Sequence, residues 1–355
     1  MRKISVDAIT GTEILARDIY SDMDTILISS GVVLKRDYTE RLKSLNVQYI
    51  YVEDDLAKGI DEKEIIELQI KEQCQEVVKD ILQKYAYCGD AQLEKLKEVA
   101  SDIIYDLLEK PEVMFNMEGV RQKNESAYSH SLNVCALSVF IALRMKIPRK
   151  KIDEIAVGSI LHDIGFSYLP VDYKSIQFED LTEKELREIK KHVIFGYSAL
   201  EKEPWLSDVA KHIILSHHER LDGSGYPFHL TGEKIKLENR IVAVCDEFDR
   251  LVYGYFTPQM KVHEAIEYIV SQGTTKYDYN VTSVFRDSVA AYPNGSIVVT
   301  SEDEIGIVLR QNTGCPTRPV LRMIQDKNGK KYIEWTLKDL TKELSLFIKD
   351  TRETV

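Results

Sequence analysis

The sequence predicts a mainly α protein, in which an all-helical central domain is flanked by a small N-terminal α+β module and a small C-terminal β-rich module. Residues 112–291 carry long apolar segments of helical character. Short apolar runs between turn residues dominate both ends of the chain. The 355 residues, 44% of them hydrophobic, suffice for two or three domains that each bury a core.

The N-terminal module is predicted to span residues 1–58. Two short apolar runs, Thr25–Ile28 and Val32–Leu34, lie on either side of a Ser-Ser-Gly turn. A helix is expected over Asp37–Leu45 and a strand over Val47–Val52. This pattern is typical of a small α+β module.

Residues 59–111 are predicted to form a helical connector, because they contain two amphipathic segments rich in Glu and Lys that can pack on the central helices. The pattern changes at Pro293, where the C-terminal module of residues 292–355 begins. Four strands and a closing helix are expected there: Ser296–Thr300, Ile305–Leu309, Val320–Ile324, Tyr332–Trp335 and the helix Leu337–Lys349.

Composition and charge exclude several classes of function. A formal net charge of −11 argues against a DNA or RNA partner, because no basic stripe offsets phosphate repulsion. No apolar run approaches about 18 residues, and Met1–Ile14 lacks an apolar signal core, so we expect no membrane span and a cytoplasmic location. The five cysteines are scattered without a CxxC spacing: Cys74, Cys88, Cys135, Cys245 and Cys315. Most of them are expected to be small core residues, in a protein of a reducing compartment.

Two doublets, one His-Asp and the other His-His, point to a metal site. His162-Asp163 ends an apolar helical segment just before Gly165, and His217-His218 ends another before a turn that contains Asp222 and Gly223. Side chains in last helical turns can point into a shared cavity. Imidazole and carboxylate groups are the usual protein ligands of divalent transition metals.

Three further residues complete a candidate ligand set. Asp246 lies in an apolar run, so its buried carboxylate needs a proton, a cation or a metal. Taken alone, His130 would more often be an ordinary helix residue. His192, in a charged helix expected from Glu183 to about Leu200, would normally be a solvated surface residue. The remaining histidines fit such structural positions and are left out of the site: His212, His229 and His263.

The motifs together resemble the HD-GYP phosphodiesterases, the HD hydrolases that cleave cyclic di-GMP. The resemblance covers roughly residues 112–291 and rests on HDIG at 162–165, HHExxDGxGYP at 217–227 and the run that ends in Asp246. It implies that the metal ligands are His130, His162, Asp163, His192, His217, His218 and Asp246. All seven positions hold the residue that the family requires.

The resemblance implies hydrolysis of a cyclic dinucleotide to a linear one by a hydroxide that bridges two metal ions, with catalytic roles for His162 and Asp163. Two divalent ions bring four positive charges, and the two aspartates bring two negative charges. The site therefore keeps a net positive charge that can bind a phosphodiester. Asp163 is the best candidate to bridge the ions, because a carboxylate can span both. Iron or manganese is implied by the family, although this N/O ligand set also accepts zinc, cobalt or nickel.

A third metal occurs in some members of the family, through a glutamate one helical turn before the first histidine ligand. Ser126 occupies that position here, so two ions are expected.

The glycine-rich loop is expected to contact the substrate or a partner: Asp222, Gly223, Gly225, Tyr226 and Pro227. In the family this loop is implicated in contacts with diguanylate cyclase (GGDEF) domains, so such a domain is an expected partner. The sequence does not determine the oligomeric state, and a homodimer is compatible with it.

The chain departs from the family where phosphate is bound. Phe166 stands where a lysine commonly follows HDIG, and Val252–Pro258 replaces an arginine-containing segment. Losing both cations is expected to slow turnover, unless Arg187 or Lys191 supplies the charge. Three functions therefore stay open: a phosphodiesterase for cyclic di-GMP, a hydrolase for another nucleotide, and a metal-containing sensor or scaffold with little or no activity.

Overall fold

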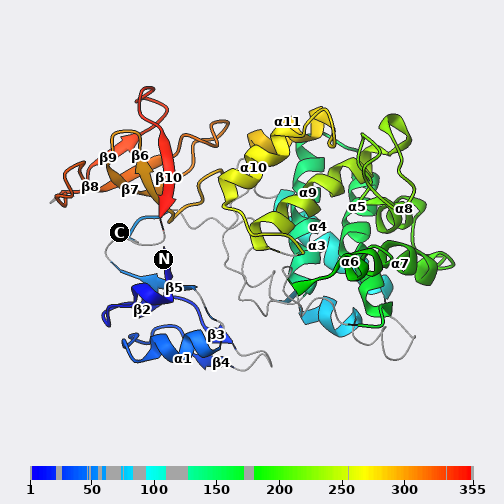
Figure 1. Cartoon of the computed structure of the whole chain (residues 1–355), viewed down its shortest axis with the longest axis horizontal. Coiled ribbons are helices and arrows are strands. Elements are labelled where there is room, and N and C mark those ends of the chain that lie inside the picture. The colour runs from blue at the N-terminus through cyan, green and yellow to red at the C-terminus, as the bar shows by residue number, and fades with distance from the viewer. Residues whose placement is uncertain are drawn as a thin grey trace. The chain divides into compact units, whose positions relative to one another are not determined.

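The protein divides into two compact units, each described here by itself (Figure 1). The computed structural model describes residues 2–20, 26–45, 47, 49–54, 58–60, 73–74, 76–82, 93–108, 127–171, 180–254, 256–332 and 334–352. The first unit contains residues 1–64, 116–125 and 289–355, and the second contains residues 65–115 and 126–288. The predicted mainly α class with flanking β modules is confirmed, whereas the predicted four-part domain division stays a prediction.

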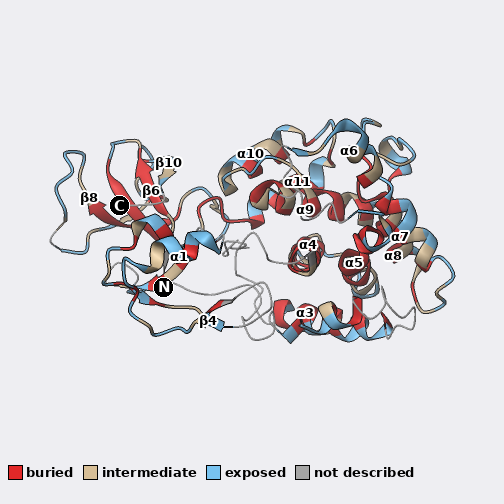
Figure 2. Ribbon diagram, turned by 60° about the horizontal axis from the view of Figure 1, so that its bottom comes forward, coloured by how far each residue is buried: buried red, intermediate tan, exposed pale blue. Residues whose placement is uncertain are grey.

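The helical unit carries most of the residues that the sequence singled out. Its helices are α3 (Leu96–Leu108), α4 (Ala127–Arg144), α5 (Arg149–Leu161), α6 (Glu183–Ile189), α7 (His192–Leu200), α8 (Asp208–Ser216), α9 (Leu237–Tyr253), α10 (Val262–Ser271) and α11 (Tyr279–Ser288). Helix α5 packs on α3, α4 and α8, and α9 packs on α4. Figure 2 shows α4 buried through most of its length and α5 buried over its second half, where its residues are mostly apolar.

A charged helix predicted from Glu183 to about Leu200 is instead divided into two. Helix α6 ends at Ile189, and α7 begins at His192. The break allows the short helix η4 (Ile164–Tyr168) to pack closely on α7. A Cβ atom at Gly165 would lie 1.8 Å from the carbonyl oxygen of His192, so only glycine fits there.

The N-terminal part of the other unit forms a small α+β module, as predicted. Its elements are β1 (Arg2–Ser5), β2 (Ile14–Leu15), β3 (Ile19–Tyr20), β4 (Ile26–Ile28), α1 (Tyr38–Ser44) and β5 (Tyr49–Glu53). Strand β5 lies between β1 and β2 in an antiparallel sheet, and β3 pairs with β4. The strand expected over Val32–Leu34 is reduced to a single bridge between Val33 and Ile14.

The C-terminal part is an antiparallel sheet of five strands in the order β10-β6-β7-β8-β9. The strands are β6 (Ile297–Thr300), β7 (Ile305–Arg310), β8 (Val320–Gln325), β9 (Leu337–Asp339) and β10 (Ile348–Arg352). Three predicted strands are confirmed. The fourth was placed too early in the sequence. The strand that follows β8 and pairs with it is β9, which begins at Leu337.

The predicted closing helix Leu337–Lys349 is wrong. Its two ends join the sheet as β9 and β10, which leaves only turns between them. The guanidinium of Arg318 donates to the carbonyl oxygens of Leu340, Leu344 and Leu346, so it satisfies acceptors that a helix would have paired internally. Tertiary contacts therefore override a leucine spacing that suits a helix. None of the described helices is long and apolar enough to cross a membrane.

Candidate metal centre

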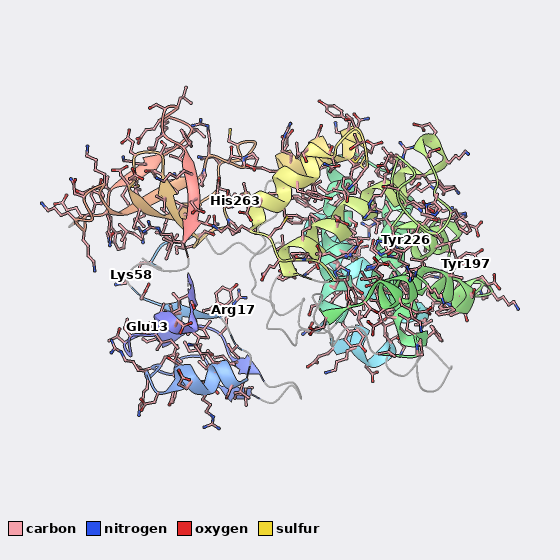
Figure 3. The ribbon with its side chains drawn as sticks, viewed as in Figure 1. Glu13, Arg17, Lys58, Tyr197, Tyr226 and His263 are labelled. Atoms are coloured by element: carbon pink, nitrogen blue, oxygen red, sulfur yellow. The ribbon has the colours of Figure 1, made fainter. Side chains whose placement is uncertain are left out.

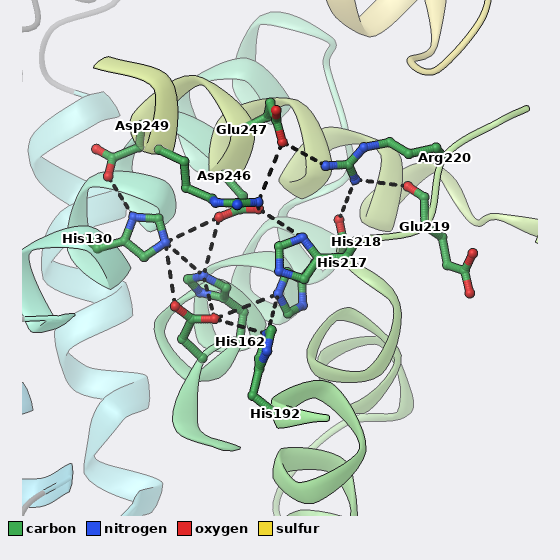
Figure 4. Close-up of polar contacts among 12 residues, drawn as sticks. His130, His162, His192, His217, His218, Glu219, Arg220, Asp246, Glu247 and Asp249 are labelled. Atoms are coloured by element: carbon green, nitrogen blue, oxygen red, sulfur yellow. Dashed lines mark hydrogen bonds and ion pairs between the residues drawn. The ribbon is translucent and has the colours of Figure 1, made fainter. Parts of the chain in front are cut away.

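The candidate ligands meet in one buried cluster inside the helical unit (Figure 4). They are His130 in α4, His162 at the end of α5 with the following Asp163, His192 at the start of α7, His217 and His218 at the end of α8, and Asp246 in α9. None of these side chains is more than 6% exposed. The structure therefore brings together all seven residues that the sequence nominated.

Helix ends orient three of the histidines. His162 and His217 are the C-terminal caps of α5 and α8, and His192 follows the end of α6. In each ring Nδ1 lies 2.6–3.0 Å from a carbonyl oxygen three or four residues earlier, so it must be the donor nitrogen. The Nε2 lone pair is then directed into the cluster, as a metal ligand requires.

His130 is oriented by a carboxylate and not by a carbonyl group. Its Nδ1 lies 2.6 Å from Asp249 Oδ2, and Asn133 Nδ2 donates to the other Asp249 oxygen at 3.0 Å. Carboxylates that hold a ligating histidine in this way fix its tautomer and raise its basicity. Asp249 was not among the residues nominated from the sequence.

Asp163 occupies the centre of the cluster. Its Oδ2 lies 3.7 Å from His130 Nε2. Its Oδ1 lies 3.3 Å from His192 Nε2, 3.5 Å from His162 Nε2 and 3.8 Å from His217 Nε2. Two groups of potential ligand atoms, one with His130 and His162 and the other with His192, His217 and His218, share Asp163.

The donor set fits divalent cations. Nε2 of His130 and Nε2 of His162 face each other at 3.2 Å, although both rings carry their required proton on Nδ1. His218 Nδ1 and Asp246 Oδ2 are 3.4 Å apart, and neither buried atom has a hydrogen-bond partner among the described residues. Lone pairs that converge in a buried site need a cation between them.

Burial keeps most of these histidines neutral. It lowers the pKa of His192 to about 4 and that of His217 to about 3, and lowers the pKa of His218 well below its usual value. Burial also acts on His130, but the carboxylates of Asp246 and Asp249 outweigh it and raise its pKa to about 9. Neutral imidazoles are the ligand form, so His192, His217 and His218 are ready to bind metal at neutral pH, whereas His130 would release a proton when metal binds.

The glycine-rich loop is held against the ligands by Glu219. This buried carboxylate accepts from the backbone N–H groups of Phe228 at 2.7 Å and Leu230 at 2.9 Å. A Cβ atom at Gly225 would lie 2.4 Å from the His218 carbonyl oxygen, so the loop can approach only with glycine there.

Within that loop, Gly223 has φ +80°, and Asp222 accepts hydrogen bonds from Ser224 in a turn at the surface. Tyr226, labelled in Figure 3, precedes Pro227 and stacks on the His218 ring with centroids 4.7 Å apart. The predicted loop therefore contacts the cluster through Tyr226, whereas Asp222 lies at the surface.

Phe166 is part of an aromatic stack. Its ring lies parallel to that of His192, with centroids 4.4 Å apart, and parallel to that of Phe256 at 5.4 Å. Phe256 belongs to the segment Val252–Pro258. Two aromatic rings of this chain are therefore stacked on one side of a candidate ligand, at positions where the resemblance implies cations in relatives.

The sequence reasoning missed two arginines that share one carboxylate, which we call the arginine pair. Arg220 Nη2 donates to Glu247 Oε2 at 2.9 Å, and Arg250 Nη1 lies 3.6 Å from the same oxygen. Arg250 also approaches Asp246 Oδ2 at 4.0 Å. Residues three and four apart share a helix face, so the position of Asp246 in α9 could have drawn attention to Asp249 and Arg250.

The histidines left out of the site have other surroundings. His212 Nδ1 contacts the Asp208 carbonyl oxygen within α8, and His229 contacts the Gly223 carbonyl oxygen at the surface. His263 lies on α10, well away from Tyr226 in Figure 3. Arg187 and Lys191 pair with Glu183 and Glu188 on exposed helix faces.

Two family models match the chain. A model of the HD domain matches residues 91–281, which is more than half of the chain. A model of a KOW domain associated with HD domains matches residues 297–353, the region of the five-stranded sheet.

Several known proteins are similar to the chain. Cyclic di-GMP phosphodiesterase PA4108 of Pseudomonas aeruginosa is 29% identical over 68% of this chain and 58% of its own length. The 3'3'-cGAMP-specific phosphodiesterase 2 of Vibrio cholerae is 28% identical over 57% of this chain and 38% of its own length. The chain thus spans little more than half of the first relative and less of the second.

Among solved structures, Bd1817, a HDG"Y"P protein from Bdellovibrio bacteriovorus, has a TM-score of 0.50 at 17% identity, over 80% of this chain and 98% of that one. It shares the fold. Together with the relatives, these matches confirm the resemblance that the motifs indicated.

Proposed function

The chain belongs to the HD domain family, and we propose that it is a metal-dependent phosphodiesterase that opens a cyclic dinucleotide, above all cyclic di-GMP, to the linear form. One observation carries this proposal. Ligand donors from α4, the start of α7 and the ends of α5 and α8 surround the carboxylate of Asp163, and Asp246 in α9 approaches His130 and His218. Such a complete and buried donor set has no structural purpose that apolar residues would not serve better.

We assign two metal ions to the cluster, because two groups of donors share one carboxylate. Asp163 would bridge the ions, with His130 and His162 on one side and His192, His217 and His218 on the other. Asp246 lies 3.2 Å from His130 and 3.4 Å from His218, so it reaches both sides. The family is metal-dependent, and iron or manganese is our assignment for the metal.

When bound, two divalent ions would supply an activated water and a concentration of positive charge beside the phosphodiester. The protein prepares this chemistry. Carbonyl groups hold His162, His192 and His217 with Nε2 inward, and Asp249 does the same for His130. The buried surroundings exclude bulk water, so the charges of Asp163 and the bound ions would act in a medium of low dielectric, beside the neutral ligand His162.

A metal-containing sensor or scaffold of low activity is the second candidate, and the Phe166 stack favours it. Without a cation at this position, the site loses a charged contact to phosphate. In that case Tyr226 and the surrounding loop would contact a GGDEF-domain partner, and a homodimer would be compatible with this role.

Product analysis tests the proposal directly. Protein reconstituted with Fe(II) or Mn(II) is incubated with cyclic di-GMP, cyclic GMP-AMP and cyclic di-AMP, and linear products are followed by chromatography. We expect linear dinucleotide from cyclic di-GMP at the fastest rate. Faster formation of linear product from another cyclic dinucleotide would identify that dinucleotide as the preferred substrate. Binding of a dinucleotide without any product would favour the sensor or scaffold.

A further inference from the structure

We propose that Lys190 binds the second phosphodiester group of a cyclic dinucleotide, the one that the metal-ligand cluster does not hold. This inference rests on the proposed function, because it names a substrate contact of the same site. It follows from the position of Lys190, from the contacts of its ammonium group and from the two phosphate groups of such a substrate.

A cyclic dinucleotide presents two phosphodiester groups on opposite sides of its ring, and each group carries a negative charge. Each group of potential metal ligands has its atoms within 4.8 Å of one another, and both groups share Asp163. A cluster of this size offers room for one phosphodiester. The second phosphodiester therefore needs a cation outside the cluster but at its edge.

Lys190 lies at this edge. It is the C-terminal cap of α6, two residues before His192, and Nδ1 of His192 lies 2.7 Å from the carbonyl oxygen of Ile189. The Nζ atom of Lys190 is 5.2 Å from the centroid of the Tyr226 ring, and the same ring stacks on His218 with centroids 4.7 Å apart. The ammonium group and a candidate ligand thus contact one aromatic ring.

The exposed ammonium group of Lys190 is not paired with a carboxylate, unlike that of the adjacent lysine. Lys191 Nζ donates to both carboxylate oxygens of Glu188 at 2.7 Å. For Lys190, the contact with the face of Tyr226 is the side-chain interaction found among the residues that the structure describes. An aromatic face attracts an ammonium group but brings no counter-charge, so the N–H donors of Lys190 can still bind an anion.

Tyr226 also gives the lysine side chain a direction. The loop that carries this tyrosine is held by the buried carboxylate of Glu219 and by the close approach of Gly225 to the His218 carbonyl oxygen. A lysine side chain that already lies on a fixed ring loses less conformational freedom when a ligand binds. The contact therefore prepares Lys190 for an anion beside the cluster.

The test compares Lys190→Met and Lys190→Arg with wild type. Methionine keeps an unbranched side chain that can lie on Tyr226, whereas arginine keeps the charge. Lys184→Met, at an exposed position of the same helix, is the matched control, and Lys191→Met tests the adjacent cation.

Each metal-loaded protein is titrated by calorimetry with two probes. A phosphorothioate analogue of cyclic di-GMP carries two phosphodiester-type groups, and the linear dinucleotide GpG carries one. Metal content and Tm are measured on the same samples, and KM and kcat are measured for cyclic di-GMP.

We expect Lys190→Met to weaken binding of the cyclic analogue about tenfold, through the loss of one charged hydrogen-bonding group. Binding of GpG, metal content and Tm should match wild type. The KM for cyclic di-GMP should rise with little change in kcat, because the second phosphodiester does not react. Lys190→Arg should keep most of the affinity, and Lys184→Met should match wild type.

Four results would overturn the proposal: no binding of the cyclic analogue by wild type, binding by Lys190→Met within twofold of wild type, an equal loss for GpG and the cyclic analogue, or the same loss in Lys191→Met alone. Loss of metal in both Lys190 variants would also overturn it, because the residue would then support the ligands and not the substrate.

The two proposals fail separately. If wild type binds the cyclic analogue through Lys190 but forms no linear product from cyclic di-GMP, the proposed function is wrong and the second phosphate site remains. If product forms at the same KM in wild type and Lys190→Met, the proposed function stands and Lys190 is not a substrate contact.

Discussion

The metal-ligand cluster and the arginine pair lie side by side, but they are specified in different ways. Each ligand sits at a helix start or end, or on a helix face, where a short motif sets its direction. His162 and His217, for example, are both helix C-terminal caps whose ring N–H completes a free carbonyl group. Arg220 and Arg250 come from separate segments, and both contact Glu247.

This difference teaches which part of such a site tolerates change. Removing a ligand leaves converging lone pairs with no cation to satisfy them. The contrast between a complete ligand set and the residues packed around it is what the following experiments would break or sharpen.

Asp163→Ala should have the largest effect. The variant loses the carboxylate that belongs to both groups of potential ligand atoms, so we expect metal content to fall from two ions per chain toward none and product formation to stop. Helical circular dichroism should remain near wild type, because α3, α4, α5 and α8 pack through apolar residues. The exposed carboxylate of Asp153 on α5 provides the control variant Asp153→Ala.

Full metal content in Asp163→Ala would contradict the bridging assignment. Three tightly bound ions in wild type would contradict the count of two, which depends on Ser126 standing where some relatives of this type carry a glutamate.

Asp249→Asn should weaken metal binding without abolishing it. The carboxylate orients His130, and residues with this role typically contribute 10- to 100-fold to metal affinity. Competition with a chelator measures the change, and Asp287→Asn on α11 serves as the exposed control. An unchanged affinity would mean that Asn133 and the surrounding helices hold His130 without help.

Phe166→Lys should separate activity from stability. A lysine restores the charge that the family carries, so kcat/KM for cyclic di-GMP should rise roughly tenfold. The stack between His192 and Phe256 is lost, so the free energy of unfolding should fall by about 2–4 kcal/mol. Denaturant unfolding measures the second effect, and Phe166→Leu controls for the lost ring; no gain in kcat/KM would show that this position does not limit turnover.

Glu219→Gln should have the smallest effect, confined to the loop. The amide keeps one acceptor oxygen where the carboxylate offers two to the N–H groups of Phe228 and Leu230, so about 1–3 kcal/mol of loop stability is at stake. Hydrogen exchange at these two amides should become faster while metal content is retained. Glu233→Gln, at an exposed position, is the control. If both variants exchange the amide hydrogens of Phe228 and Leu230 at the same rate, Glu219 does not hold the loop.

Much of the fold could be predicted because the signals were local. The strands at 297–300, 305–310 and 320–325 are short apolar runs between turns, and the helix ends at His162 and His217 follow from the glycine and turn signals after them. The closing helix could not be rejected from sequence. Its leucine spacing suits a helix, and only the pairing of β9 and β10 with other strands, together with Arg318, excludes it.

The sequence by itself determined the identity of the seven candidate ligands and the family, because metal chemistry restricts those positions to histidine and carboxylate at fixed spacings. Only the tertiary structure decided what surrounds them. Asp249 and Arg250 lie close to the ligands because α9 packs on α4 and α8, and Phe166 faces His192 because η4 packs on α7. Such contacts depend on how the helices pack, and a short sequence motif does not predict that packing.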